Sequence, residues 1–180
     1  MIPDTVNGLP LHALAVHGAV VMVPLAALLG LLFAVPRLRE WARWPLALVG
    51  VGAAVATWVA VESGERLEAA LENNGALGGP VHDLVERHAE LAEQMEWMVI
   101  GYAVLAVAAA LVVERSRGST RADSDRTPAP ASRGSSALAL VFSVLLVLGA
   151  VAVGVQTYRV GDAGAKAVWN PTGDIQFSSD

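Results

Sequence analysis

Two histidines in apolar helical segments are the side chains of this 180-residue sequence best placed to do chemistry. His17 lies in the first hydrophobic segment, and His88 lies on an apolar stripe whose members recur at steps of three and four residues. The stripe consists of Leu84, His88, Leu91, Met95, Met98, Tyr102 and Leu105. Neutral imidazoles from two facing helices can occupy both axial positions of one haem iron, so this pair predicts a haem b site as one hypothesis. The alternative is that each histidine packs in the bundle and bonds to a backbone carbonyl or to Glu62.

The depths of the two histidines matter for the haem hypothesis. On straight parallel helices, His17 lies below the start of its span and His88 lies above the apolar core that begins near Met95. The helix of residues 81–95 would have to press into the bundle for the two imidazoles to meet. His12 is closer to the surface, so we expect it to be solvated.

A cluster of carboxylates between residues 62 and 96 forms the second candidate site. Glu62 or Glu65 together with His17 or His88 could bind a divalent cation or guide protons, and Glu62, Glu65 and His88 are our predicted metal residues. The alternative is a solvated face with ion pairs such as Glu62 with Arg66, four residues apart. The other acidic members are Glu68, Asp83, Glu86, Glu90, Glu93 and Glu96.

Composition sets the class of the protein. Hydrophobic residues make up 54% of the chain, charged residues make up 16%, and the mean hydropathy is +0.52, which predicts a polytopic membrane protein. The absence of cysteine excludes disulfides, thioether-linked haem and cysteine-ligated iron–sulfur clusters. No nucleophile–base pair, phosphate loop or basic patch is visible, so we expect neither a nucleic-acid partner nor an enzymatic activity.

Four apolar stretches predict an all-α, four-helix transmembrane bundle in a lipid bilayer. The first span runs from about residue 11 to 35, the second from 44 to 61 and the third follows a charged helix without a break. A helical outer hairpin is expected over 62–96, between spans two and three. The predicted organisation is an outer segment 1–10, three spans with the hairpin in 11–115, a disordered cytoplasmic linker 116–135, the fourth span 136–158 and an outer tail 159–180.

Charge predicts the orientation. The two connections 36–43 and 114–135 hold eight of the twelve Lys and Arg residues but only four acids, whereas the other side of the chain holds thirteen acids. Basic residues resist translocation. The protein is therefore expected in a bacterial inner membrane with both termini outside.

Four segments of the chain resemble the bacterial membrane-protein family called domain of unknown function 2231. They are HALAVHGAVVMVPLAAL, WVAVESGERLE, VERHAELAEQ and YRVGDAGAKAVW, and the resemblance covers most of residues 9–169. It implies four spans, a set of shared polar residues and, through distant similarity to dihaem b-type cytochromes, a haem-binding ancestry. Asp162 stands where the family often has histidine. The positions matching the shared polar residues are His12, His17, Glu65 and His88.

Three functions remain open from the sequence. The first is a non-enzymatic membrane module, such as an accessory subunit of a larger membrane complex or a homo-oligomer, because small-residue faces such as Gly50 with Ala54 and Ala150 with Gly154 allow close helix packing. The second is a haem b or quinone-linked electron-transfer protein. The third is a cation or proton conduit with an acidic outer mouth, for which the spans lack an acid at mid-bilayer.

Overall fold

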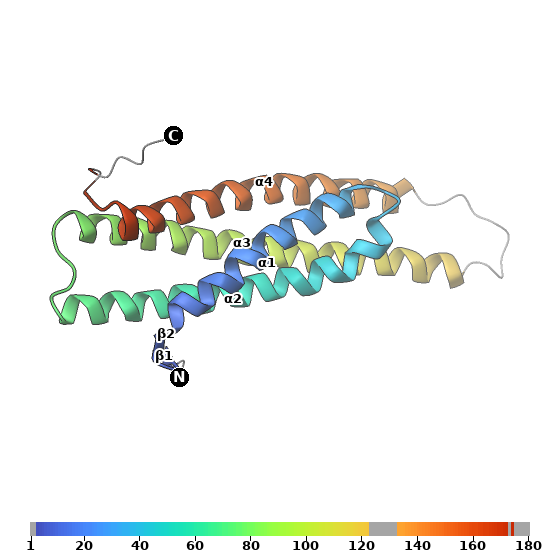
Figure 1. Ribbon diagram of the computed structural model, residues 1–180. Coiled ribbons are helices and arrows are strands. Elements are labelled where there is room, and N and C mark those ends of the chain that lie inside the picture. Colours follow the sequence, from blue (N-terminus) through green and yellow to red (C-terminus); the bar gives the residue numbers. More distant parts are fainter. Residues whose placement is uncertain (1–2, 123–132, 173, 175–180) are drawn as a thin grey trace, which may run out of the picture.

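The computed structural model of the chain describes residues 3–122, 133–172 and 174, and it consists of four long helices after a short hairpin (Figure 1). The predicted all-α four-helix bundle is confirmed. The elements are β1 (Thr5–Val6), β2 (Leu9–Pro10), α1 (Leu11–Ala34), α2 (Arg39–Asn73), α3 (Pro80–Ala122) and α4 (Arg133–Trp169).

The helices form a ring in chain order. α1 packs against α2 and α4, and α3 packs against the same two helices from the opposite side, so α1 and α3 face each other across a diagonal. The short connection 35–38 turns α1 into α2 at one end of the bundle, and residues 74–79 join α2 to α3 at the other end, beside the close of α4 (Figure 1). Gly75 and Gly79 take positive φ values of 68° and 56° in that turn, which glycine adopts without steric cost. We call this second end, which also carries the start of α1, the histidine end.

Apolar side chains fill the inside of the bundle and also cover its outside. The largest fully buried side chains are Phe33, Leu46, Leu146, Val23, Val99 and Val153. Many others point outward, such as Leu48, which is 71% exposed. All four helices are long and apolar enough to cross a membrane, and exposed leucine and valine are stable there because lipid surrounds them. The protein is therefore a multi-pass membrane protein.

Exposed aromatic residues mark two levels along the bundle. Trp41 and Trp44 lie near the start of α2, and Trp58, Trp97 and Tyr158 lie toward the histidine end, all at least 45% exposed. Tryptophan and tyrosine gather at membrane–water interfaces. Trp41 and Trp58 are about 25 Å apart along the helix, close to the hydrocarbon thickness of a bilayer. The stretch between these two levels matches the thickness of the hydrocarbon core of a bilayer, and α2, α3 and α4 continue past the second level.

Two helices extend further than the sequence suggested. α4 continues to Trp169, although a non-helical tail was expected from residue 159. No proline occurs between residues 131 and 170, and Ala163 is buried at 7% exposure, so packing stabilises this extension despite Gly161 and Gly164. α3 and α4 also occupy 116–122 and 133–135 of the predicted linker; its remaining residues, 123–132, lie outside the described part.

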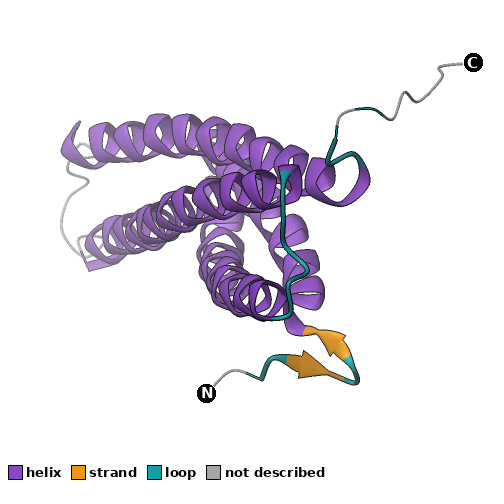
Figure 2. Ribbon diagram, turned by 90° about the vertical axis from the view of Figure 1, so that its left-hand side faces the viewer, coloured by secondary structure: helices purple, strands orange, loops and turns teal. Residues whose placement is uncertain are grey.

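A small hairpin precedes α1 and was not predicted. Asn7 and Gly8, at its turn, have φ values of 51° and 79°, and Asn-Gly is the preferred pair for a tight hairpin turn. Figure 2 shows it beside the beginning of α1 at the edge of the bundle. Its Asp4 carboxylate lies 3.7 Å from the Arg66 guanidinium, so the hairpin is tied to α2.

Candidate functional site

Two histidines on diagonally opposite helices come together at the histidine end. The ring centroids of His12, on α1, and His88, on α3, are 6.4 Å apart, and the ring planes are at 86° to each other. Both side chains are partly buried. Two imidazoles that bind one metal from opposite sides through nitrogen, with bonds of about 2 Å, place their ring centroids roughly 6 Å apart, and edge-to-face rings in direct contact lie at a similar distance. The observed separation therefore suits a shared ligand.

Each ring of this pair is held by a carbonyl of a neighbouring helix. His12 Nδ1 lies 2.9 Å from the Ala60 carbonyl oxygen on α2, and His88 Nδ1 lies 3.0 Å from the Val160 carbonyl oxygen on α4. A carbonyl only accepts, so both Nδ1 atoms must donate. In a neutral ring this leaves Nε2 with its lone pair free, and metal-binding histidines are commonly oriented by such a second hydrogen bond.

The pair lies close to the aromatic level at the histidine end. Ala60 and Val160, which hold the two rings, follow Trp58 and Tyr158 by two residues in the direction away from the membrane centre. Burial lowers the pKa of His88, the hydrogen bond to Val160 opposes that effect and the neighbouring His12 adds to it. The neutral, ligand-competent imidazole is thereby favoured at His88.

His17 does not take part in this arrangement. Its Nδ1 donates to the Ala13 carbonyl oxygen of its own helix at 2.6 Å, and its side chain is exposed. The pair that we predicted, His17 with His88, is therefore not the pair that the structure brings together. His12, which we expected to be solvated, takes that place. The reason is that α3 stays inside the bundle for two turns beyond Met95, with Leu91 buried at 4% exposure, so His88 lies level with His12 rather than with His17.

The predicted carboxylate site is spread over the surface. Glu62 lies 3.7 Å from Arg66, which is the surface pair weighed from the sequence, and Glu65 is exposed. Within the described residues, no group of three or more His, Asp or Glu side chains could hold a metal ion. The metal site of Glu62, Glu65 and His88 stays a prediction, because the described residues do not bring these three side chains together as a cluster.

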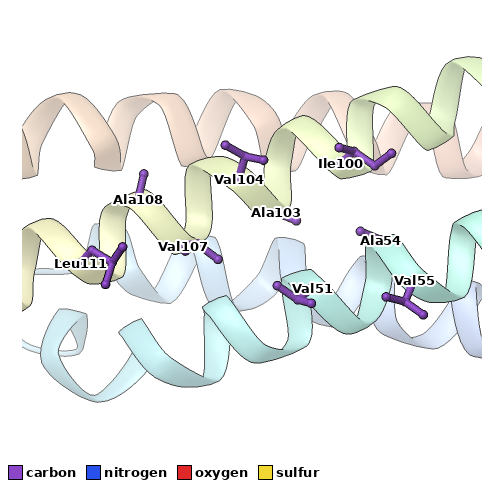
Figure 3. Close-up of a pocket in the computed structure, with 9 residues that line it drawn as sticks. All are labelled: Val51, Ala54, Val55, Ile100, Ala103, Val104, Val107, Ala108 and Leu111. Carbon is purple, nitrogen blue, oxygen red and sulfur yellow. The ribbon is translucent and has the colours of Figure 1, made fainter.

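An apolar groove lies between α2 and α3 near mid-membrane, with a volume of about 460 Å³ (Figure 3). It contains no polar side chain that could orient a ligand or take part in a reaction. Gly50 lies beside it, where a Cβ would make ordinary van der Waals contact with the Ala103 Cα at 3.6 Å. The groove is lined by Val51, Ala54, Val55, Ile100, Ala103, Val104, Val107, Ala108 and Leu111.

Sequence reasoning missed two glycines that shape the histidine pair. A Cβ at Gly64 would lie 3.0 Å from His12 Nδ1, and a Cβ at Gly164 would lie 2.9 Å from His88 Cε1. Each ring thus lies directly on the backbone of the helix whose carbonyl it binds. The sequence did contain a sign of these glycines. An acid, a glycine and a base recur at steps of two residues, once in Glu62–Arg66 and once in 162–166.

Comparison with known proteins identifies one family. The model of the family described as predicted membrane protein (DUF2231) matches residues 8–174, which is nearly the whole chain. No curated protein and no solved structure matches it.

Proposed function

The chain belongs to the DUF2231 family of predicted membrane proteins, and we propose that it is a non-enzymatic membrane module that binds haem b through His12 and His88. The observation that carries the proposal is the pair itself. Two imidazoles from diagonal helices lie 6.4 Å apart, each with Nδ1 engaged by a carbonyl. Diagonal helices of a four-helix bundle can present ligands to both faces of a cofactor placed between them.

The donor set fits the cofactor. His12 and His88 would hold a haem iron without any cysteine, and the haem would supply one-electron chemistry. The chain's own residues would orient it. Ala60 and Val160 fix the ring directions through their carbonyls, and the small residues Ser63 and Ala163 are buried at the same end.

The position of the pair supports an electron-transfer role for this module. The histidines lie just beyond the aromatic level, so a group bound there is close to one membrane surface and accessible to a quinone head group or to a partner at that surface. The excess of arginine at the opposite end supports an orientation with the histidine end outside a bacterial inner membrane. Small-residue surfaces and exposed apolar faces support assembly with a larger membrane complex or a second copy.

The conduit hypothesis gains no support from the described core. Its buried polar side chains are Arg43, Thr57, Ser63, Ser143 and Gln156, and they lie in two groups toward the two ends of the helices. Between them the core consists of side chains such as Leu46, Ala53 and Val99, and the Tyr102 hydroxyl there is already bonded to the Ala26 carbonyl oxygen. An ion would have to cross this apolar stretch without a ligand.

An optical spectrum tests the proposal. Protein purified from haem-replete cells and reduced with dithionite should show a sharp b-type α band, and His12→Ala or His88→Ala should abolish it. His17→Ala is the matched control, because this histidine is exposed on the same helix as His12, and it should keep the band. A colourless native protein, or a band lost in His17→Ala but kept in His12→Ala, would reject the proposal.

A further inference from the structure

The two halves of the bundle repeat each other position by position. Positions 19, 23, 26, 30 and 33 of α1 are all buried, and so are the residues 76 positions later in α3: Met95, Val99, Tyr102, Ala106 and Ala109. The same offset relates His12 to His88 and Met22 to Met98. It also relates the exposed His17 to the exposed Glu93. The buried faces of α1 and α3 therefore share one register.

Helices α2 and α4 share a partial repeat with an offset of 100, which holds at five of the nine buried positions of α2. Positions 43, 46, 50, 53 and 63 of α2 are buried, and so are Ser143, Leu146, Ala150, Val153 and Ala163 of α4. Next to these positions the motif acid-x-Gly-x-base occurs twice, in Glu62–Arg66 and in 162–166. The acid and the base of each motif are paired, with Glu62 and Arg66 at 3.7 Å and Asp162 and Lys166 at 2.7 Å. The larger offset reflects the longer connection between α3 and α4.

The repeat includes every contact that holds the two rings. His12 bonds to the carbonyl of Ala60 and lies on Gly64, whereas His88 bonds to the carbonyl of Val160 and lies on Gly164. Each glycine is four residues beyond its carbonyl partner, one helical turn away on the same face. Each ring therefore meets the same pair of backbone features on its neighbouring helix.

We infer that the two-histidine site is a duplicated unit in which Gly64 and Gly164 are equivalent positioning residues. Each glycine leaves room for the imidazole to lie on the helix backbone, and that placement lets Nδ1 reach the carbonyl and keeps Nε2 free. The choice of haem as ligand rests on the proposed function, but the positioning does not. A duplicated unit presents one histidine from each side of the bundle. A cofactor held between two histidines needs this arrangement.

Nitrogen spectroscopy of the histidines tests this inference without any cofactor. In full-length protein labelled with ¹⁵N in the histidine rings, His12 and His88 should both give signals with a proton on Nδ1. Gly64→Ala should change the His12 signals and leave His88 as it is, and Gly164→Ala should do the reverse. Gly161→Ala is the control, because nothing lies within 4 Å of a Cβ at this position, and it should change neither.

A thermal-stability cycle covers the case in which a variant folds poorly. Gly64→Ala should lower Tm, and adding His12→Ala should restore it, because the added methyl group then has no ring to meet. Adding His88→Ala instead should not restore it. The inference would be overturned if His12→Ala and His88→Ala changed the Tm of the Gly64→Ala variant equally. It would also be overturned if neither glycine variant changed the ¹⁵N signals of the histidine rings. If the ring signals follow the glycines but the protein binds no haem, only the proposed function fails.

Discussion

His12 and His88 lie with their ring planes nearly perpendicular, at 86°, and each ring is held from a different neighbouring helix. The pair thus links all four helices at one end of the bundle. α1 and α3 supply the rings, and α2 and α4 supply the carbonyls. A change at any of these contacts alters both the packing of this end and the direction of one Nε2 atom.

Gly30 is predicted to be irreplaceable for packing at the centre of the bundle. A Cβ at Gly30 would run into the Tyr102 hydroxyl group, which donates to the Ala26 carbonyl oxygen at 3.3 Å. Gly30→Ala should lower the free energy of unfolding by about 1–3 kcal/mol, as overpacking does. Gly154→Ala, which meets nothing within 4 Å, should be neutral or stabilising by up to about 1 kcal/mol. Unfolding in detergent compares them, and equal losses would contradict this packing.

The ion pair between Arg43 and Glu114 should stabilise the contact of α2 with α3. The Arg43 side chain is 9% exposed, and that of Glu114 is 53% exposed, so removing the carboxylate leaves a buried cation. Glu114→Ala should cost about 1–3 kcal/mol. Glu90→Ala is the control. It breaks the pair with Arg87, in which both side chains are 55% exposed, and should cost less than about 1 kcal/mol. Similar costs for the two variants would argue against the buried pair.

Acidification should destabilise the fold through His88. Because the pKa of His88 is lowered from 6.5, the unfolded chain takes up this proton at a higher pH than the folded protein does. The contribution of His88 to the free energy of unfolding is therefore constant above pH 6.5 and becomes unfavourable as the pH falls below it. His88→Ala should flatten the decline in Tm over that range. An unchanged slope would contradict the lowered pKa.

The orientation can be tested by single-cysteine labelling, since the chain has no cysteine of its own. Ala76→Cys, in the connection between α2 and α3, should react with a membrane-impermeant thiol reagent added to intact cells. Thr127→Cys, in the chain between α3 and α4, should react only after the membrane is opened. The reverse pattern would invert the proposed topology.

Several features of the structure follow from local patterns in the sequence. The four spans were readable from apolar length, and the face of α3 with His88, Leu91, Met95 and Tyr102 was readable from its spacing, because both depend on residues close in the chain. The extension of α4 to Trp169 was missed, since it is stabilised by tertiary packing at Ala163.

The identity of the histidine pair required information between helices. His17 stood in the more apolar sequence, but the rotation and depth of a helix decide which side chains face inward. At His17 the ring bonds to its own helix and points outward. His12 lies opposite His88 because of the axial alignment of α1 with α3. The spacing of apolar residues within one helix does not determine that alignment.

The electron paramagnetic resonance spectrum of the oxidised, purified protein tests the central claim most directly, because it reports how many imidazoles bind the iron and how their planes are related. The ring planes at 86° predict a low-spin ferric haem with the strongly anisotropic signal of near-perpendicular axial imidazoles. His12→Ala and His88→Ala should each convert it to a high-spin signal or remove the haem, and His17→Ala should leave it unchanged. A protein without a haem signal, or a native spectrum that is high-spin, would contradict the binding of one iron by both histidines.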